Sequence, residues 1–387
     1  MSTRLIRRGG AAAAAALLNL LPMAAAPIHV VTAASPCDGW TMSTLFSGLG
    51  ILEYVIPEPR GTLLVSSSSR NTVERMSRAG ATTTLASLNA PGAIVLRGGG
   101  AFVTTGDSAT SGALNTADGT VDTLDLATGA VAVYSSGLTM PNGMTFSAAG
   151  DGYVTRDVPL DTTVTRIRVA DPANPDTAWA RVPTTNGARV DPTQTWLYTS
   201  STFEAAADIR RVRLTDPTQV EVVVSLSGVG SPVPKGLDDM TMDAAGILYV
   251  TANGSGEVLR VDPVARTACV IASGLQNPSS VEFGAGGGFA ADHLVVGGFD
   301  GTIRELTPPP QSAPGGSSGS VASGSPPAGG ANGSPTTAAA RVPVAAAAAA
   351  ALAGALVLGL RRRRARPGRS EVRRPPAPPA GPGTTGT

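Results

Sequence analysis

Histidine and cysteine are scarce in this chain of 387 residues, and their scarcity excludes several kinds of site. Only two histidines are present, His29 and His293, and His29 lies in an N-terminal segment that we expect to be removed. A Ser-His-Asp triad would have to depend on His293 alone, and a mechanism that needs a histidine pair is excluded. The two cysteines, Cys37 and Cys269, are too few for a disulfide-built scaffold and cannot form a zinc site between them. They suffice for one disulfide, and the sequence leaves their pairing open.

Charge is also sparse, because charged residues make up only 15% of the chain and Lys235 is the only lysine. When residues 1–34 and 361–387 are set aside, 18 basic and 27 acidic residues remain. This excess of acid argues against a nucleic-acid partner and is compatible with a cation site. No Gly-rich phosphate-binding loop leads from a predicted strand into a helix, which argues against a nucleotide site of that kind.

The N-terminus has the composition of a targeting segment. Residues 1–34 begin with arginines, continue with an apolar run and end with small residues, as secretory signal peptides do. Cleavage after Ala26 or after Ala34 fits this pattern, and an uncleaved N-terminal anchor is the alternative. We therefore expect the protein to be exported.

The C-terminal part predicts a tether. Residues 342–360 form an uncharged run nearly long enough to cross a bilayer, and the basic segment 361–387 follows at once. This pair predicts a transmembrane helix with a cytoplasmic tail, and a soluble alanine-rich helix is the alternative. Residues 309–341 are rich in Pro, Gly and Ser and predict a disordered linker. We expect a single-pass protein of the cell membrane whose monomeric extracellular domain spans residues 37–308.

Residues 37–308 repeat one pattern at a period of roughly 40 to 50 residues, which indicates a repeat architecture. In each of six units, short β-branched and apolar runs alternate with Gly- or Asp-containing turns. Four such strands per unit, without helical periodicity, are typical of a propeller blade, so the sequence predicts an all-β, six-bladed β-propeller. The last unit, from Ser273, is short, and we expect the segment GWTMSTLFS before the first unit to supply its outer strand. Such a closure would leave no open sheet edge.

Polar residues recur at one position near the start of these units. Five units align without gaps on their second strands, LVS, FVT, YVT, LYT and YVT. The residue eleven positions before each of these strands is, in turn, Glu53, Pro91, Asn142, Asn186 and Asp238, and Ser279 takes this position in the sixth unit. One position per blade projects to the same radius around the ring axis, so we expect these side chains to converge.

Glu53, Asn142, Asn186 and Asp238 supply only oxygen donors, two of which are carboxylates. That donor set suits one hard divalent cation, Ca²⁺ first, with Mg²⁺, Mn²⁺ or Zn²⁺ as alternatives. Asp239, the neighbour of Asp238, is expected to point the other way, into the turn or solvent, and an exchange of roles between the two is the alternative. A further alternative is that these residues only form turns before strands, although turn chemistry does not explain Glu53.

With these residues in place, the chain resembles the senescence marker protein/gluconolactonase/luciferin-regenerating enzyme (SGL) family of six-bladed propellers. The resemblance covers about residues 45–308 and rests on GILEYVIPEPRGTLLVS, PNGMTFSAAGDGYVT, TNGARVDPTQTWLYTSS and LDDMTMDAAGILYVTANGSGEVLRVDP. It implies that one divalent cation on the ring axis is held by Glu53, Asn142, Asn186 and Asp238, and that Asp238 is also the general base. The chain departs from the members that act on sugar lactones at Met140, where those members often carry Arg.

Two functions follow as expectations. The first is a surface-tethered, cation-dependent hydrolase of a small-molecule lactone or ester, in which Asp238 takes the proton of the attacking water. The second is a non-catalytic surface propeller that binds a partner and keeps the cation as a structural element. Asp238 favours catalysis, whereas Met140 in place of Arg favours binding. His293 is expected to be a surface residue.

Overall fold

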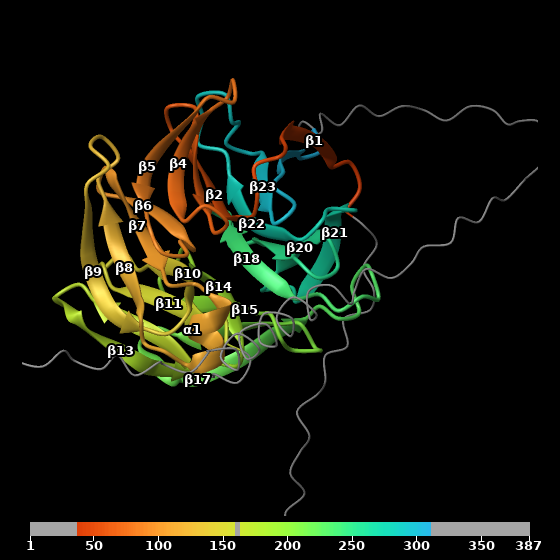
Figure 1. Ribbon diagram of the computed structural model, residues 1–387. Coiled ribbons are helices and arrows are strands. Elements are labelled where there is room, and N and C mark those ends of the chain that lie inside the picture. The colour runs from red at the N-terminus through yellow and green to blue at the C-terminus, as the bar shows by residue number, and fades with distance from the viewer. Residues whose placement is uncertain (1–36, 159–162, 311–387) are drawn as a thin grey trace, which may run out of the picture.

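The computed structural model describes residues 37–158 and 163–310, which form a ring of β-sheets around a central axis (Figure 1). Within the described residues, no helix is both long enough and apolar enough to cross a membrane. Four segments predicted from the sequence lie outside the described residues: the signal peptide (1–34), the linker (309–341, apart from its first two residues), the transmembrane helix (342–360) and the tail (361–387).

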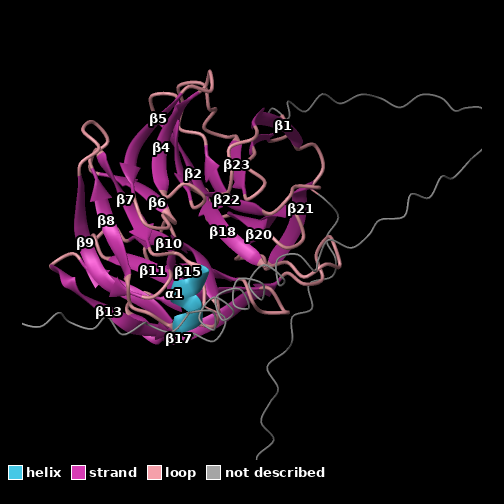
Figure 2. Ribbon diagram, viewed as in Figure 1, coloured by secondary structure: helices cyan, strands magenta, loops and turns pink. Residues whose placement is uncertain are grey.

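Six four-stranded antiparallel sheets surround the axis, which confirms the predicted six-bladed all-β propeller (Figure 2). The innermost strands of neighbouring blades contact one another around the ring. Blade 1 consists of β2 (Leu52–Glu58), β3 (Thr62–Ser67), β4 (Thr72–Ser77) and β5 (Thr82–Ser87). Blade 2 consists of β6 (Ile94–Arg97), β7 (Gly100–Thr105), β8 (Gly119–Leu124) and β9 (Val131–Leu138). Blade 3 consists of β10 (Pro141–Phe146), β11 (Gly152–Arg156), β12 (Thr163–Arg168) and β13 (Asp171–Arg181). Blade 4 consists of β14 (Thr185–Val190), β15 (Trp196–Ser201), β16 (Asp208–Arg213) and β17 (Asp216–Ser225). Blade 5 consists of β18 (Leu237–Met242), β19 (Leu248–Ala252), β20 (Glu257–Asp262) and β21 (Thr267–Ser273). Blade 6 consists of β22 (Pro278–Phe283), β23 (Leu294–Gly298), β24 (Ile303–Thr307) and β1 (Thr41–Phe46). One short helix, α1 (Ala109–Leu114), lies between β7 and β8.

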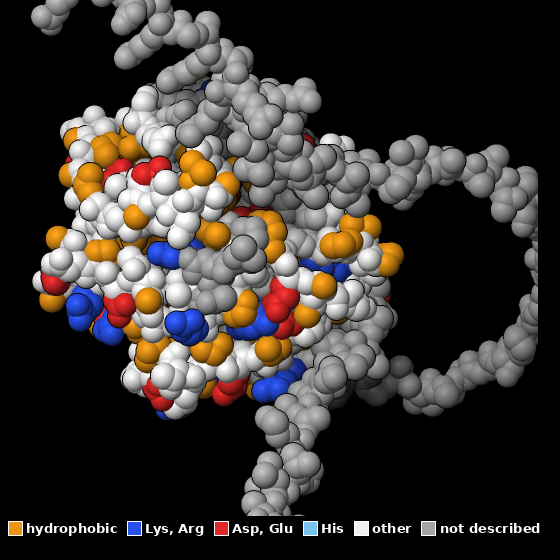
Figure 3. All heavy atoms as spheres, turned by 60° about the horizontal axis from the view of Figure 1, so that its bottom comes forward, with side chains coloured by type: hydrophobic (Ala, Val, Ile, Leu, Met, Phe, Trp, Pro, Cys, Tyr) orange, Lys and Arg blue, Asp and Glu red, His pale blue; other side chains and the backbone are white. Residues whose placement is uncertain are grey.

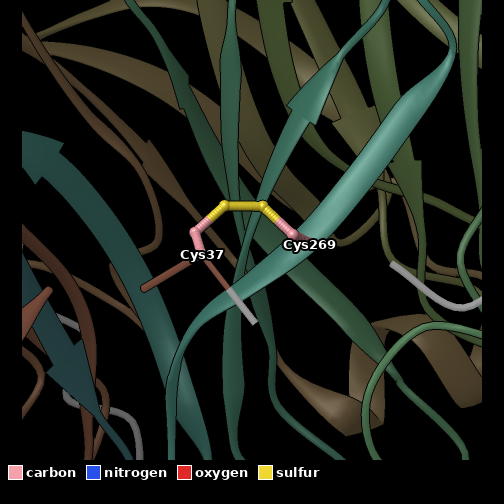
Figure 4. Close-up of a disulfide and its surroundings, with 2 residues drawn as sticks. All are labelled: Cys37 and Cys269. Carbon is pink, nitrogen blue, oxygen red and sulfur yellow. A yellow bond between two sulfur atoms is a disulfide. The ribbon is translucent and has the colours of Figure 1, made fainter. Parts of the chain in front are cut away.

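The N-terminal strand closes the ring. β1 pairs antiparallel with β24, with Thr41 opposite Thr307, and becomes the outer strand of blade 6. This pairing confirms the closure predicted for GWTMSTLFS. A disulfide joins Cys37 to Cys269 of β21, with the Cα atoms 5.7 Å apart (Figure 4). The start of the described chain is therefore held by backbone hydrogen bonds to blade 6 and by a covalent bond to blade 5.

Apolar side chains fill the space between neighbouring blades. One buried cluster, for example, combines Leu64 of blade 1, Ile94 and Val103 of blade 2, and Met144 of blade 3. The second strands are buried along almost their whole length, as in β3 and β19. This burial on both faces of the sheet explains why each second strand contains two or three apolar residues in succession instead of alternating strictly between apolar and polar residues.

A β-bulge interrupts the innermost strand of five blades. β6 of blade 2 pairs with β7 without a shift in register. A bulge adds a residue to one strand and re-aims its side chains, and bulges are frequent next to active sites. The shifts mark one end of the central channel, and they fall between Leu52 and Tyr54, Pro141 and Met144, Thr185 and Ala188, Leu237 and Met240, and Pro278 and Ser280.

Candidate functional site

Five of the six residues aligned from the sequence lie inside these bulges. Pro91 is the sixth, and it precedes β6 in the blade without a bulge. Ser279 Oγ donates to the backbone oxygen of Leu52 at 2.8 Å, so this side chain joins blade 6 to blade 1. The residues in the bulges are Glu53, Asn142, Asn186, Asp238 and Ser279.

Side chains that are far apart in the sequence meet at this end of the channel. Asn142 Nδ2 donates to Asp107 Oδ2 at 2.9 Å and lies 3.4 Å from Glu53 Oε1, which joins blades 3, 2 and 1. Within blade 5, Asn253 Nδ2 donates to Asp238 Oδ2 at 3.1 Å, and Asp238 is close enough to Glu53, Asp107 and Asp157 for their charges to raise its pKa in addition to burial. The expected convergence around the axis is therefore present for these blades.

Two carboxylates of this site are not in the aligned set. Asp107 follows β7 and Asp157 follows β11, so both lie where a second strand ends rather than where an innermost strand starts. Asp157 accepts hydrogen bonds from the side chains of Thr202 and Asn186. Continuing the alignment past the second strands would have found this second ring of polar residues, because Asp107, Asp157, Thr202 and Asn253 stand four or five residues after the first residue of their strand motif. We define the acid–amide cluster as Glu53, Asp107, Asn142, Asp157, Asn186, Asp238 and Asn253.

The four carboxylates of the acid–amide cluster disfavour one another's charge. Burial and the charge of Asp157 raise the pKa of Glu53 to about 8. Burial raises the pKa of Asp157 to about 7. Burial together with the charges of Glu53 and Asp157 raises the pKa of both Asp107 and Asp238. Crowded carboxylates in such a space favour either protonation or the presence of a cation.

The oxygen atoms of the cluster fit a hard cation. Asn186 is 3% exposed and donates to Asp157, and its Oδ1 is buried without a hydrogen-bond partner. Asp107 Oδ1 is also buried and unpartnered. Such oxygens cost free energy unless something binds them, and carboxylate and amide oxygens are the donors that Ca²⁺ prefers. Among the residues that the structure describes, no three Asp, Glu, His or Cys side chains are grouped to hold an ion by themselves, so the predicted set depends on the amide oxygens of Asn142 and Asn186.

Asp239 does not point into a turn or solvent, so that prediction is wrong. The residue is 4% exposed, and Asp239 Oδ1 lies 3.7 Å from Arg189 Nη1. The physical reason is the bulge in β18, which spans Asp238 and Asp239. In a regular strand, consecutive side chains point to opposite faces, whereas this bulge leaves both carboxylates buried.

Arg189 belongs to a second network, one to three residues further along the innermost strands. Arg189 Nη2 donates to Tyr54 OH at 2.8 Å and forms an ion pair with Glu282. Tyr54 OH donates to Glu282 Oε1 at 2.7 Å, and Thr241 Oγ1 donates to Glu282 Oε2 at 2.9 Å. This network joins β2, β14, β18 and β22. We call it the arginine hub, and it consists of Tyr54, Arg189, Asp239, Thr241 and Glu282.

His293 lies in blade 6, apart from the acid–amide cluster. Its side chain is 24% exposed, and its Nδ1 is 3.1 Å from Glu305 Oε1 of β24.

On the face of the molecule shown in Figure 3, basic, acidic and apolar side chains are interspersed. The charges of that face thus alternate in sign instead of forming one patch.

The chain matches the family model described as the SMP-30/Gluconolactonase/LRE-like region over residues 58–296. Among solved structures, it is similar to a gluconolactonase from Xanthomonas campestris, with 17% sequence identity, a TM-score of 0.55, and coverage of 72% of this chain and 94% of that chain. It is also similar to the calcium-binding protein regucalcin from Agrobacterium tumefaciens, with 16% identity, a TM-score of 0.54, and coverage of 72% and 96%. At these identities the likeness to the two structures shows the fold. No curated protein sequence matches the chain.

Proposed function

This chain belongs to the SMP-30/gluconolactonase/LRE-like family, and on that premise we propose that it is a hydrolase that opens a lactone or an ester with the help of one divalent cation. The observation that carries the proposal is Asn186 Oδ1, a buried oxygen without a hydrogen-bond partner inside the acid–amide cluster. The carboxylates around it have raised pKa values, chiefly because they are buried. The structural likeness to a gluconolactonase and to a calcium-binding protein supports the same choice.

Glu53, Asn142, Asn186 and Asp238 would hold the cation, for which Ca²⁺ is our first choice. When bound, the cation supplies positive charge that polarises the carbonyl group of the substrate. Asp107 would act from outside this set, because it accepts a hydrogen bond from Asn142 Nδ2 at 2.9 Å. That bond fixes the rotation of the Asn142 amide and so directs its oxygen.

Asp238 would act as the general base. Asn253 Nδ2 donates to Asp238 Oδ2 at 3.1 Å, and Asn277 Nδ2 donates to Asn253 Oδ1 at 3.0 Å, so a chain of amides orients the carboxylate. Burial and the charges of neighbouring carboxylates raise the pKa of Asp238 and so favour proton uptake. As water attacks the carbonyl carbon, Asp238 takes a proton from that water, and the same proton passes to the leaving oxygen when the ester C–O bond breaks.

A non-catalytic binding propeller is the second candidate, and one observation favours it. Two cavities of about 360 and 150 Å³ lie outside the acid–amide cluster, the first between residues 37–42 and β21, the second at the arginine hub. In that case a cation would serve only to stabilise the centre of the ring. For either function we propose export and a membrane tether, which rest on the composition of residues 1–34 and 342–387.

Hydrolysis of a panel of lactones and aryl esters by the full-length protein tests the proposal. We expect turnover in Ca²⁺ that EDTA removes, and a decrease in kcat of at least about 100-fold in Asp238→Asn, because the proton acceptor is lost. Asp292→Asn is the matched control, since Asp292 is exposed in blade 6, and it should keep wild-type activity. Stabilisation by Ca²⁺ without turnover of any substrate would instead favour the binding propeller.

A further inference from the structure

Three exposed apolar side chains lie on connections at the same end of the propeller as the acid–amide cluster. Among the residues that the structure describes, four large apolar side chains other than valine are exposed: Met42, Ile51, Leu114 and Phe203. Met42 lies on β1, the outer strand of blade 6. The other three, exposed by 45%, 61% and 44%, lie on connections rather than on strands.

These three connections are at the same end of the propeller as the cluster. Strand direction alternates within a blade, so the start of an innermost strand and the connection from a second to a third strand share one end. Ile51 directly precedes β2, Leu114 ends α1 between β7 and β8, and Phe203 lies between β15 and β16. Figure 2 shows α1 in cyan. We call the end that carries these loops the mouth of the channel.

Each of these loops is also bonded to its surroundings at the mouth. Ile51 stands two residues before Glu53, and its N–H donates to Ser69 Oγ at 3.1 Å. Phe203 follows Thr202, whose hydroxyl lies 2.8 Å from Leu237 O and within hydrogen-bonding reach of the carboxylate of Asp157. Ile51 and Phe203 are therefore close in sequence to residues that are hydrogen-bonded at this end of the propeller.

The helix α1 is held in the same way. The N–H of Met140, two residues before Asn142, donates to Ser111 Oγ of α1 at 3.3 Å. A Cβ on Gly112 would stand 2.4 Å from Met140 Sδ, so the glycine lets the helix lie directly against this methionine. Leu114, at the end of α1, is thereby fixed near the third blade.

Three basic side chains near the mouth are engaged in ion pairs. Lys235 is 2% exposed and its Nζ is 2.5 Å from Glu257 Oε2. Arg70 Nε is 2.8 Å from Glu74 Oε1, and Arg210 Nη2 is 2.7 Å from Asp208 Oδ2. These cations are therefore already neutralised and are poorly suited to bind an acidic substrate.

We propose that the substrate is a lactone or ester that carries an apolar alkyl or acyl chain, and that Ile51, Leu114 and Phe203 contact this chain. The inference rests on the proposed function, because the acid–amide cluster would take the polar carbonyl end of the same molecule. Burial of each methylene of the chain should raise kcat/KM by about threefold to fourfold until the apolar surface is covered. A polyhydroxylated lactone would leave its hydroxyl groups facing apolar side chains and would be a poor substrate.

The test is a homologous series of γ-alkyl-γ-butyrolactones, from methyl to octyl, hydrolysed by the full-length protein in Ca²⁺ beside glucono-δ-lactone. We expect kcat/KM to rise with chain length and to exceed that for the sugar lactone. In Leu114→Ser and Phe203→Ser, the ratio of kcat/KM between the octyl and methyl compounds should fall by about fivefold or more. Val264→Ser is the matched control, because Val264 is 89% exposed in the turn between β20 and β21, at the opposite end, and should leave the ratio unchanged.

Calorimetric binding of the matching γ-alkyl lactams, whose amide bond resists hydrolysis, provides a readout that does not need turnover. Hydrolysis without a dependence on chain length, or with preference for the sugar lactone, would overturn this inference and leave the proposed function standing. Absence of hydrolysis with lactam binding that strengthens with chain length would overturn the proposed function and retain the apolar binding surface. Absence of both hydrolysis and lactam binding would overturn both.

Discussion

The acid–amide cluster and the arginine hub use the same innermost strands, but only the hub supplies its own counter-charge. In the cluster, carboxylates lie near other carboxylates, and none of the seven residues is an arginine or a lysine. In the hub, Arg189 is paired with Glu282 and lies 3.7 Å from Asp239. The two neighbouring layers thus differ in that the hub contains an arginine among its carboxylates, although burial still raises the pKa of Asp239 to about 7, whereas the cluster contains no positive charge of its own.

The protonation behaviour of the two layers follows from this difference. Burial opposes the charged form of Arg189, but Glu282, Tyr54 and Asp239 raise its pKa, so the guanidinium stays ionised. In the cluster, burial and Asp157 act in the same direction and raise the pKa of Glu53 to about 8. The comparison suggests that the hub stabilises the ring and that the cluster binds a ligand, at some loss of stability.

The largest expected effect is on the hub. Arg189→Met should reduce the free energy of unfolding by about 3–5 kcal/mol, because Glu282 and Asp239 are then buried without their cation. Urea unfolding followed by circular dichroism measures this change. Glu282→Gln introduced into Arg189→Met should recover part of the loss, since it removes one of the unpaired charges.

A surface ion pair provides the control for that measurement. Arg211 pairs with Glu221 at 2.7 Å, but the two side chains are 23% and 42% exposed. Arg211→Met should therefore cost about 1 kcal/mol or less. An equal cost for both arginine variants would show that the hub is no more important for stability than a solvent-exposed pair.

The sequence predicts the features of this channel that depend on a fixed register. The blade count, the closing strand and the positions of Glu53, Asn142, Asn186 and Asp238 all follow from strands that repeat at constant spacing. The roles of these four residues as cation ligands remain predictions. The constant spacing of the strands therefore predicts well where side chains lie around the ring axis.

The predictions from the sequence are wrong or incomplete where a bulge shifts the pairing of an innermost strand with its neighbour. A bulge cannot be recognised from apolar alternation, so the sequence predicts Asp239 in a turn or in solvent, whereas it is buried near Arg189. Asp107 stands five residues after the first residue of its strand motif, whereas Asp157 stands four residues after the first residue of its own, so one fixed spacing does not find both. The arginine hub also depends on the bulges, because they change which side chains downstream face the channel.

Replacement of Glu53 in the cluster should have an effect of intermediate size on the free energy of unfolding. The direction of this effect depends on whether the cation is present. Without a cation, Glu53→Gln should be more stable than the wild type, because the buried carboxylate is removed. In Ca²⁺ at about 100 times its Kd, the wild type should gain about 2.7 kcal/mol, and the variant should gain much less. Thermal unfolding in EDTA and in Ca²⁺ measures both values.

Glu221→Gln is the matched control, because Glu221 is a surface residue of β17. It should respond to Ca²⁺ as the wild type does. If Ca²⁺ stabilised Glu53→Gln as strongly as the wild type, Glu53 could not be a ligand of the cation and the comparison between the two layers would lose its basis.

The smallest effect is a dependence of stability on pH in the metal-free protein. The unfolded chain releases the Glu53 proton near the ordinary value of 4.5, whereas the folded chain keeps it until about 8. The contribution of Glu53 to the free energy of unfolding should therefore fall as pH rises between these values and become constant above about 8, and the other carboxylates with raised pKa values add to the fall. One retained proton corresponds to about 1.4 kcal/mol per pH unit, so urea unfolding in EDTA at pH 6 and pH 7 should resolve it.

A bound cation should remove this slope, because the charged carboxylates are then favoured in the folded state. Arginine hydrogen bonds lower the pKa values of Glu58 and Glu74 despite burial, so those groups change stability only below pH 4.5, outside the interval measured. The difference between the EDTA and Ca²⁺ curves cancels the contribution of groups that the cation does not affect. A slope that is the same in EDTA and in Ca²⁺ would mean that the protons belong elsewhere, and that the cluster, like the hub, is already balanced by the protein itself.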